Sequence, residues 1–195
     1  VQQHILELQA QGIAPPERVP MFWTVPNWLL SIAQPALQVA ASTSSGEAEP
    51  VLIRMPNGDL FVTVGSDQTD RSLETSSVVL AKLTCPKMLA PTAWRFEDVA
   101  QRWDSLHLHA FAGEDETCYQ EGTLALIRPP LEVLEQTCPS AFPVDRPRIL
   151  FLGTIPLQAG SFRFARRFLA LLEDRERGRS LRCDYTLEDL SSPSS

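Results

Sequence analysis

The pattern of apolar and polar positions along the chain predicts short β-strands joined by turns, with a few helices between them. The clearest signal is a hairpin of two apolar runs, residues 50–55 and 60–64, around Asn57-Gly58, a pair that suits the positive φ angles of a tight turn. Further strands are expected at residues 37–41, 106–112, 118–127, 149–152 and 181–187. Helices are expected at residues 2–11, 96–106, 129–136 and 164–173. We therefore predict an α+β fold that is rich in strands.

The length of the chain suits one domain. Its 195 residues are enough for a sizeable hydrophobic core, and 44% of them are hydrophobic, as in ordinary globular proteins. We expect a single domain over residues 1–190 and a disordered tail over residues 191–195, which hold only serine and proline. The chain opens at Val1 in what reads as the interior of a helix, so we expect the natural protein to begin further upstream.

Charge and cysteine content bear on the class of partner. A net charge of −7 and an isoelectric point near 5.0 argue against binding nucleic acid, and the arginines between residues 163 and 179 interleave with acids. No apolar run reaches the roughly 20 residues of a membrane span, and we expect no secretory signal. The cysteines form no CxxC pair, so we read them as reduced thiols of a cytoplasmic protein. They are Cys85, Cys118, Cys138 and Cys183.

Acidic residues gather around the predicted hairpin. Glu47 and Glu49 are two residues apart, so in an extended segment both side chains project from one face. Adjacent carboxylates repel each other unless a positive charge lies between them, and Mg²⁺, Mn²⁺ and Ca²⁺ are cations that choose oxygen ligands. Asp67, after the hairpin, is a candidate for a third oxygen. The alternative interpretation is a charged edge that faces solvent.

Lys82 and a His-Glu pair are further candidates for chemistry. Lys82 interrupts an apolar run, where a lysine must extend to solvent, pair with a carboxylate, or act as a charged group in a site. His4 and Glu7 share one face of the predicted first helix. They form either an ordinary surface pair or a carboxylate that orients an imidazole to take a proton from water.

Six short motifs follow one another in the order of a known family. They are HxxE at His4 and Glu7, ExE at Glu47 and Glu49, DxTxR at Asp67, Thr69 and Arg71, a lysine ahead of a proline at Lys82 and Pro86, YQxGT from Tyr119 to Thr123, and GTxP from Gly153 to Pro156. Each motif alone is weak, but their common order is fairly specific. On these residues the chain resembles the fumarylacetoacetate hydrolase (FAH) superfamily, in its C-terminal catalytic domain, and within it the DUF2848 family.

The resemblance implies a mixed β-roll or sandwich with a few short helices, commonly a homodimer, that binds Mg²⁺ or a similar ion. Its partner is a small carboxylic acid substrate. It assigns metal binding to Glu47, Glu49 and Asp67, catalysis to His4, Glu7 and Lys82, and substrate binding to Arg71, Gln120 and Thr154. The His-Glu pair belongs to a lid helix at the start of the chain.

The implied reactions are C–C bond hydrolysis of acylpyruvates or β-diketones, decarboxylation of oxaloacetate-type acids, hydration of 2-hydroxydienoates, and isomerisation. A metal that binds a 2-oxo acid stabilises the enolate that forms, and a lysine adds positive charge there. With the dyad activating water, we expect a divalent-metal-dependent C–C hydrolase of small 2-oxo or dioxo carboxylic acids. The alternatives are a decarboxylase or hydratase of a related acid, and a degenerate domain that binds its ligand without turnover.

The remaining polar candidates receive simpler roles. His107 and His109 share one face of a predicted strand at a spacing that a metal could use, but no third ligand is near in the sequence. Asp59, Asp70 and Glu74 are expected in turns and on the surface.

Overall fold

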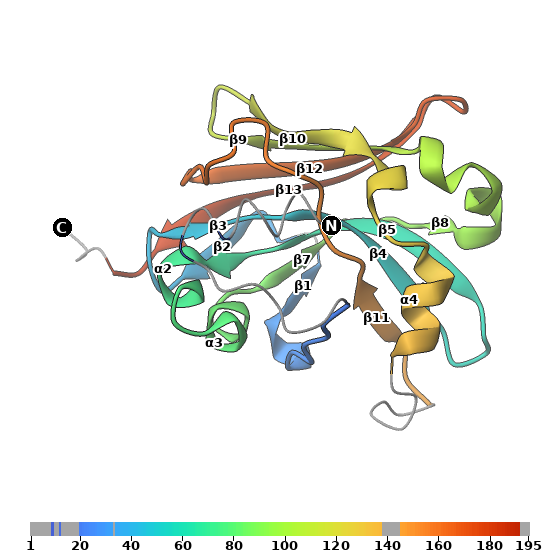
Figure 1. The fold of residues 1–195 in the computed structure, drawn as a ribbon, viewed down its shortest axis with the longest axis horizontal. Helices are drawn as coiled ribbons and strands as arrows, with labels where there is room; N and C mark the ends of the chain where they lie inside the picture. Colours follow the sequence, from blue (N-terminus) through green and yellow to red (C-terminus); the bar gives the residue numbers. More distant parts are fainter. Residues whose placement is uncertain (1–8, 10–11, 13–19, 33, 138–144, 192–195) are drawn as a thin grey trace.

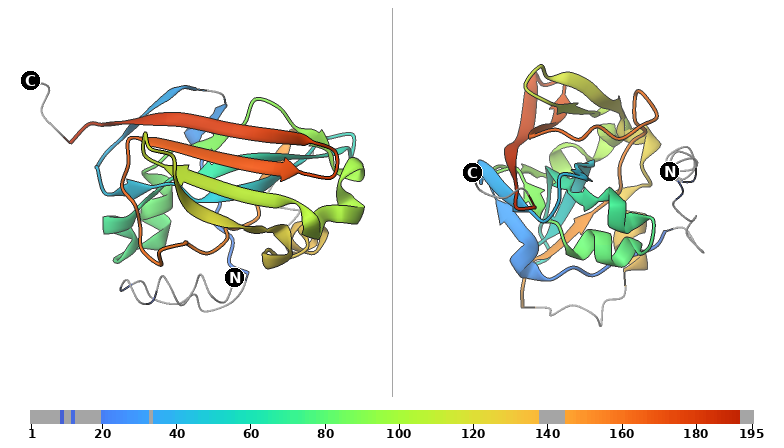
Figure 2. Two further views of the ribbon diagram at one scale, coloured as in Figure 1. Left: turned by 90° about the horizontal axis from the view of Figure 1, so that it is seen from above. Right: turned by 90° about the vertical axis from the view of Figure 1, so that its left-hand side faces the viewer.

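The computed structural model describes residues 9, 12, 20–32, 34–137 and 145–191, and within them two β-sheets face each other (Figures 1 and 2). The first sheet contains, in spatial order, β1 (Leu30–Ile32), β7 (Lys87–Leu89), β5 (Leu60–Asp67), β4 (Ala48–Arg54) and β11 (Arg148–Phe151), and β8 (Trp94–Arg95) also pairs with β5. The second sheet contains β10 (Thr117–Thr123), β9 (His107–Ala112), β12 (Arg167–Asp174), β13 (Arg179–Asp189) and β2 (Ala36–Val39). A short pair, β3 (Ser44–Ser45) and β6 (Thr69–Asp70), lies beside them.

Helices are short and lie at the ends of the sheets. The α-helices are α2 (Arg71–Glu74), α3 (Val78–Leu83) and α4 (Pro130–Gln136). Single turns of 3₁₀ helix are η1 (Asn27–Leu29), η2 (Phe96–Asp98) and η4 (Leu124–Leu126), and η3 (Ala100–Ser105) is longer. None of the described helices has the length and apolar character needed to cross a membrane. The strand-rich α+β fold predicted from the sequence is confirmed.

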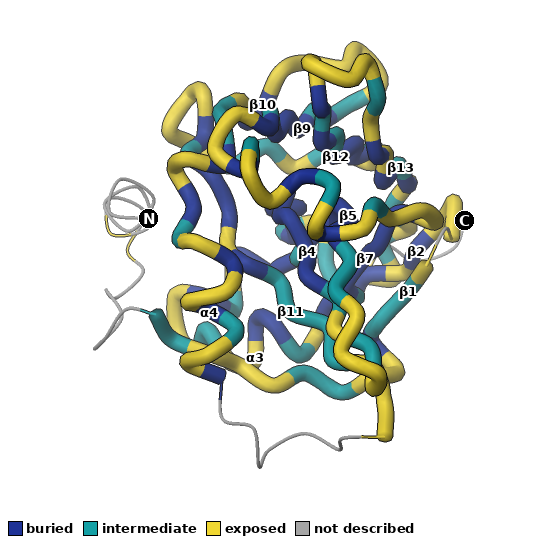
Figure 3. The backbone as a smooth tube through the Cα atoms, turned by 90° about the vertical axis from the view of Figure 1, so that its right-hand side faces the viewer, coloured by how far each residue is buried: buried dark blue, intermediate teal, exposed yellow. Residues whose placement is uncertain are grey.

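The hydrophobic core fills the space between the two sheets. Val62 and Val64 of β5 belong to the same buried cluster as Phe168, Ala170 and Leu172 of β12, which alternate along their strand and face inward. Figure 3 shows the buried backbone, in dark blue, along β4, β5 and β12. The core therefore ties together strands that are far apart in the sequence and holds β4 and β5, the hairpin that the sequence predicted.

The predicted hairpin and most predicted strands are confirmed within a few residues of their ends. β4 and β5 pair antiparallel around a turn in which Gly58 has φ of 93°. The helix expected at residues 164–173 is wrong, because β12 occupies this segment. β12 is a central strand between β9 and β13, with Leu169 buried on one face and Phe168 on the other. A strand that is apolar on both faces has no period-2 pattern to distinguish it from a buried helix.

Two smaller differences concern helix type and strand length. The helix expected at residues 96–106 consists of the 3₁₀ helices η2 and η3, separated at Val99, whose φ and ψ are not helical. The strand expected at residues 118–127 ends at Thr123, where η4 begins. The single-domain boundary at residue 190 stays a prediction, and most of the predicted first helix and of the tail lies outside the described residues.

Gly65 tests the close packing of β5 against its neighbours. A Cβ at this position would collide with the Met88 backbone carbonyl of β7 and lie 2.9 Å from the Phe151 ring. Backbone cannot move aside cheaply, so G65A should lower the free energy of unfolding by at least about 2 kcal/mol. At Gly122 the tightest contact of a new Cβ is the end of the exposed Leu126 side chain, which can move aside. G122A should therefore change the free energy of unfolding by less than about 0.5 kcal/mol. Urea unfolding of both variants is the measurement, and equal effects would contradict the prediction.

Candidate metal centre

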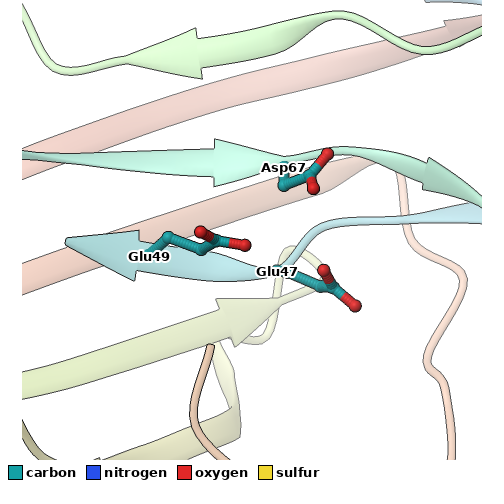
Figure 4. A group of neighbouring side chains, drawn as sticks. All are labelled: Glu47, Glu49 and Asp67. Carbon is teal, nitrogen blue, oxygen red and sulfur yellow. The ribbon is translucent and has the colours of Figure 1, made fainter. Parts of the chain in front are cut away.

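Three carboxylates come together at one end of the β4–β5 pair. Glu49 lies in β4, Glu47 directly precedes this strand, and Asp67 is the last residue of β5 (Figure 4). The strands pair with Ala48 opposite Ser66, and the Asp67 amide donates to the Glu47 carbonyl at 3.0 Å. One oxygen from each carboxylate lies within 4.8 Å of the others. Across the described residues, no other three His, Cys, Asp or Glu side chains converge in this way.

The carboxylates are buried rather than displayed at an edge. Glu47 and Glu49 are each only 4% exposed, and the Asp67 side chain is 14% exposed. The alternative of a charged edge that faces solvent is therefore wrong for both glutamates. A buried carboxylate is costly unless hydrogen bonds and positive charges compensate it, so the positive groups around these acids decide what the site can do.

Three cationic side chains contact the acids. Lys82 Nζ lies 2.9 Å from Glu47 and 2.7 Å from Asp67. Arg71 Nη1 lies 3.0 Å from the other Glu47 oxygen, and Lys87 Nζ lies 2.7 Å from the other Asp67 oxygen. Each oxygen of Glu47 and Asp67 thus has a positive partner, whereas no ion pair to Glu49 is found among the described residues.

Lys82 reaches the acids from α3, the helix formed by the apolar run in the sequence. Ser77 caps the helix by accepting a hydrogen bond from the Leu80 amide, and Lys82 lies in its last turn. The ammonium also donates to the Thr69 hydroxyl at 2.9 Å. Burial alone lowers the pKa of Lys82, but Asp67 and Glu47 outweigh it and hold the pKa above its usual range. Lys82 is therefore a charged group facing the carboxylates, and of the readings left open by the sequence the one in which it only extends to solvent is wrong.

Glu49 has the most perturbed acidity of the three carboxyls. Burial raises its pKa from 4.5 to about 8, and the negative charges of Asp67 and Glu47 add to the effect. Lys82 and the Gly153 amide, which donates to Glu49 at 2.7 Å, oppose the shift only in part. The centre lacks enough positive charge to keep all its carboxylates ionised at neutral pH.

The residues present fit a hard divalent cation. Their ligand atoms are all carboxylate oxygens, which Mg²⁺, Mn²⁺ and Ca²⁺ prefer, and one oxygen of each is within chelating reach of the others. A divalent charge there would favour the ionised form of Glu49, which burial and then the neighbouring carboxylates disfavour. The donor set does not distinguish among the three ions.

Arg71 begins α2 and lies between the acids and an aromatic ring. Its Nε donates to the Ser45 hydroxyl at 2.7 Å, and its Nη1 donates to Glu74 at the same distance. The Phe162 ring stacks on the guanidinium at 4.1 Å. Nη2 is buried and has no hydrogen-bond partner among the described residues. Arg71 thus keeps donor capacity next to the carboxylates, which suits an anionic ligand.

The expected turn and surface roles hold for only one of the other acids. Asp59 is exposed and lies in the hairpin turn, as predicted. Asp70 and Glu74 are buried, so their assignment to the surface is wrong. Asp70 caps α2 by accepting from the Ser72 and Leu73 amides. Sequence spacing could not reveal this burial, because it depends on how α2 packs beside β3.

Gln120 and Thr154 form hydrogen bonds with the backbone of Ala48, the residue between the two glutamates. The Gln120 side-chain carbonyl accepts from the Ala48 amide at 3.0 Å, and the Thr154 hydroxyl donates to the Ala48 carbonyl at 2.8 Å. Gln120 also donates to Thr154 at 2.7 Å and is fully buried. These contacts fix Ala48 and so orient the residues on either side of it. The substrate-binding role of Gln120 and Thr154 stays a prediction.

Neither histidine of the described residues, His107 or His109, adds a ligand to this centre. His4 and Glu7, the predicted dyad, lie outside the described residues. His107 and His109 stack in parallel at 6.1 Å on β9, and His109 Nε2 lies 3.1 Å from Glu173. Lys87 was missed by the sequence reasoning. The available signal was a lysine directly after Pro86, at the start of an apolar segment.

The raised pKa of Glu49 predicts a specific pH dependence. Its folded pKa lies above the unfolded value, so its contribution to stability is fully present below pH 4.5 and is lost as the pH rises through about 8. With a chelator present, the stability of the wild type should fall relative to E49Q between about pH 5 and 8. The folding equilibrium constant should change by up to about tenfold per pH unit. Urea titrations at each pH measure this.

The matched control is E97Q, because Glu97 is a carboxylate with 76% of its side chain exposed. Its stability curve should run parallel to that of the wild type. A parallel curve for E49Q as well would contradict the assignment of the raised pKa to Glu49.

Solved structures share the fold at low sequence identity. A 2-keto-3-deoxy-D-arabinonate dehydratase complexed with magnesium and 2,5-dioxopentanoate superimposes with a TM-score of 0.59 at 15% identity, over 82% of this chain and 59% of that chain. A 5-carboxymethyl-2-hydroxymuconate delta-isomerase from Mycobacterium smegmatis gives 0.62 at 17%, over 93% and 74%. An HpcE protein from the same organism gives 0.67 at 17%, over 96% and 71%. The chain thus spans about six tenths of the dehydratase.

The family comparison agrees with the motifs. No curated protein matches the sequence. A family model described as a protein of unknown function, DUF2848, matches residues 1–185, which include the ExE pair, Asp67 and Lys82. The resemblance inferred from the order of six motifs is therefore confirmed. The chain belongs to the DUF2848 family, and its fold is that of the FAH superfamily.

Proposed function

We propose that the protein is a divalent-metal-dependent enzyme that acts on small 2-oxo or dioxo carboxylic acids, and that it hydrolyses a C–C bond of an acylpyruvate-type substrate. The observation that carries the proposal is the convergence of Glu47, Glu49 and Asp67 within 4.8 Å, with Lys82 against two of them. The structural relatives support it, since one is complexed with magnesium and a dioxo acid.

The bound ion would act as a Lewis acid toward the 2-oxo acid and the enolate derived from it. Glu47, Glu49 and Asp67 would hold it. Lys82 supplies a fixed positive charge beside the carboxylates, where negative charge on the substrate would be stabilised. Arg71 offers the donor Nη2 to a substrate carboxylate, and stacking on Phe162 holds its guanidinium in place.

The type of reaction depends on the group that handles water or protons. For hydrolysis, we assign water activation to His4 with Glu7 as the carboxylate that orients it. The second candidate is a lyase or isomerase reaction on a related 2-oxo acid, favoured by relatives described as a dehydratase and an isomerase. The third candidate is a domain that binds its ligand without turnover. In that case we expect metal binding but no product.

Calorimetric titration tests the metal centre. Wild type should bind Mg²⁺, and both E47Q and E49Q should bind it at least about tenfold more weakly, because each loses a charged ligand at nearly constant volume. E121Q is the matched control, since Glu121 is half exposed on β10, outside the centre. Equal Mg²⁺ affinity in all four proteins would rule out this metal site.

Product analysis separates the reactions. An acylpyruvate, oxaloacetate and 2-hydroxypentadienoate are each supplied with Mg²⁺, and we expect cleavage of the acylpyruvate to pyruvate and a second carboxylic acid. K82M should lower kcat at least about hundredfold, because charge stabilisation of the developing enolate is lost. Turnover of only oxaloacetate or the dienoate would assign the second candidate. Mg²⁺ binding without any product would support the third.

We further propose that the protein acts in the cytoplasm as a homodimer. Its described cysteines, Cys85, Cys118 and Cys183, are free, which suits a reducing compartment. Exposed apolar side chains, Trp28 and Ile32 among them, offer surface for association. Light scattering should give about twice the 21.7 kDa chain mass, and a monomer mass at all micromolar concentrations would contradict the dimer.

A further inference from the structure

Tyr119 is a buried tyrosine whose hydroxyl has no protein group to hydrogen-bond. It lies in β10, directly before Gln120, and only 4% of it is exposed. Its ring packs edge-on against Phe168 of the core, with the ring centroids 6.1 Å apart. The hydroxyl is buried and forms no hydrogen bond of suitable geometry with the described residues. Such a hydroxyl costs free energy, so its surroundings indicate which ligand could compensate it.

The Tyr119 hydroxyl lies near a second donor that is also unused. Tyr119 and Arg71 are close enough for each to perturb the pKa of the other, and Arg71 Nη2 is likewise buried without a partner among the described residues. The other nitrogens of the guanidinium are occupied, Nε by Ser45 and Nη1 by Glu47 and Glu74. Two donors therefore remain free where Arg71 borders the metal centre.

A small pocket lies beside these two donors. Its volume is about 210 Å³, and Tyr119 lines it together with Phe162, the residue whose ring stacks on the Arg71 guanidinium at 4.1 Å. Arg163 also lines the pocket, but Asp115 compensates its charge at 2.9 Å. Pockets for drug-sized molecules measure roughly 300–1,000 Å³, so this one suits a smaller molecule that extends from the centre.

The chemistry of the two donors selects the group that they would bind. A carboxylate only accepts hydrogen bonds and has two oxygens, so it can satisfy a hydroxyl and a guanidinium N–H together. An amide has a single acceptor oxygen, and its NH₂ group would meet one of the donors with further donors. A carboxylate is also the group whose negative charge the guanidinium favours.

We propose that Tyr119 is a further substrate-binding residue: its hydroxyl and Arg71 Nη2 both donate to the carboxylate of the 2-oxo acid, and this pair selects the acid over its amide. The inference rests on the proposed function, since it supplies the substrate with its carboxylate. It adds to that function a residue for which the resemblance assigns no role, and it gives the unpaired hydroxyl of β10 a partner.

The substitution Y119F removes only the hydroxyl and separates binding from a structural role. An unpaired buried hydroxyl opposes folding, so without ligand Y119F should lower the unfolding equilibrium constant at least about threefold. Y185F is the matched control, because Tyr185 is the other tyrosine of the chain, is fully buried, and hydrogen-bonds with Ser66 and Gln68 at 2.8 Å. Y185F should raise that constant at least about threefold. Urea unfolding with a chelator present measures both.

Ligand affinity is measured by calorimetry with saturating Mg²⁺. The probes are pyruvate, a 2-oxo acid without the second oxo group at which hydrolysis would occur, and pyruvamide, its uncharged amide. Y119F should bind pyruvate at least about tenfold more weakly than the wild type, because a hydrogen bond to a charged oxygen is lost. Its affinity for pyruvamide should fall by less than about threefold. Mg²⁺ alone should bind both proteins within about twofold, because the hydroxyl is not one of the three carboxylate ligands.

The outcomes separate this inference from the proposed function. Unchanged affinity of Y119F for pyruvate, or an equal loss for pyruvate and pyruvamide, overturns the role of Tyr119 and leaves the metal centre standing. A Y119F protein that is less stable than the wild type, or that does not fold, also overturns it, because the hydroxyl then supports the structure. A wild type that binds neither Mg²⁺ nor pyruvate overturns the proposed function and the inference together.

Discussion

The shortage of positive charge around a buried group of carboxylates is the constraint on which this structure depends. Glu47, Glu49 and Asp67 lie where water is largely excluded, and Arg71, Lys82 and Lys87 compensate two of them directly. Glu49 forms no ion pair among the described residues, and burial raises its pKa to about 8. A purely structural ion-pair cluster would be expected to balance. An imbalance of this sign is what a cation-binding site requires.

The fold keeps these repelling groups together by fixing the backbone that carries them. Ala48, between the two glutamates, is held through its amide by Gln120 and through its carbonyl by Thr154. Gln120 lies in β10 of the second sheet and Thr154 follows β11 of the first, so both sheets contribute to the orientation of the tripeptide Glu47-Ala48-Glu49. Gly65, opposite Glu49, has no side chain and lets β7 approach β5, which brings Lys87 to Asp67. The contacts that pack the two sheets together therefore also set the geometry of the centre.

Local chemistry made part of the fold readable from the sequence. Asn57-Gly58 between two apolar runs specifies a hairpin because few residues adopt positive φ, and β4 and β5 followed from it. The segment that forms β12 was misread, since a strand between two neighbours is apolar on both faces and its pattern equals that of a buried helix. Helix or strand is decided there by the partners β9 and β13, which lie far away in the sequence.

The sequence by itself determined which residues could form the centre. The ExE spacing places two carboxylates on one face, Asp67 and Lys82 stood out by their positions after the hairpin and within an apolar run, and the order of motifs added Arg71. Only the tertiary structure decided that these groups are buried and which cation meets which oxygen. It also placed Asp70 and Glu74 inside and revealed Lys87, because the pairing of β7 with β5 sets a lysine opposite an aspartate twenty positions earlier in the chain. Spacing along a chain defines directions within one element, whereas burial and charge compensation arise between elements.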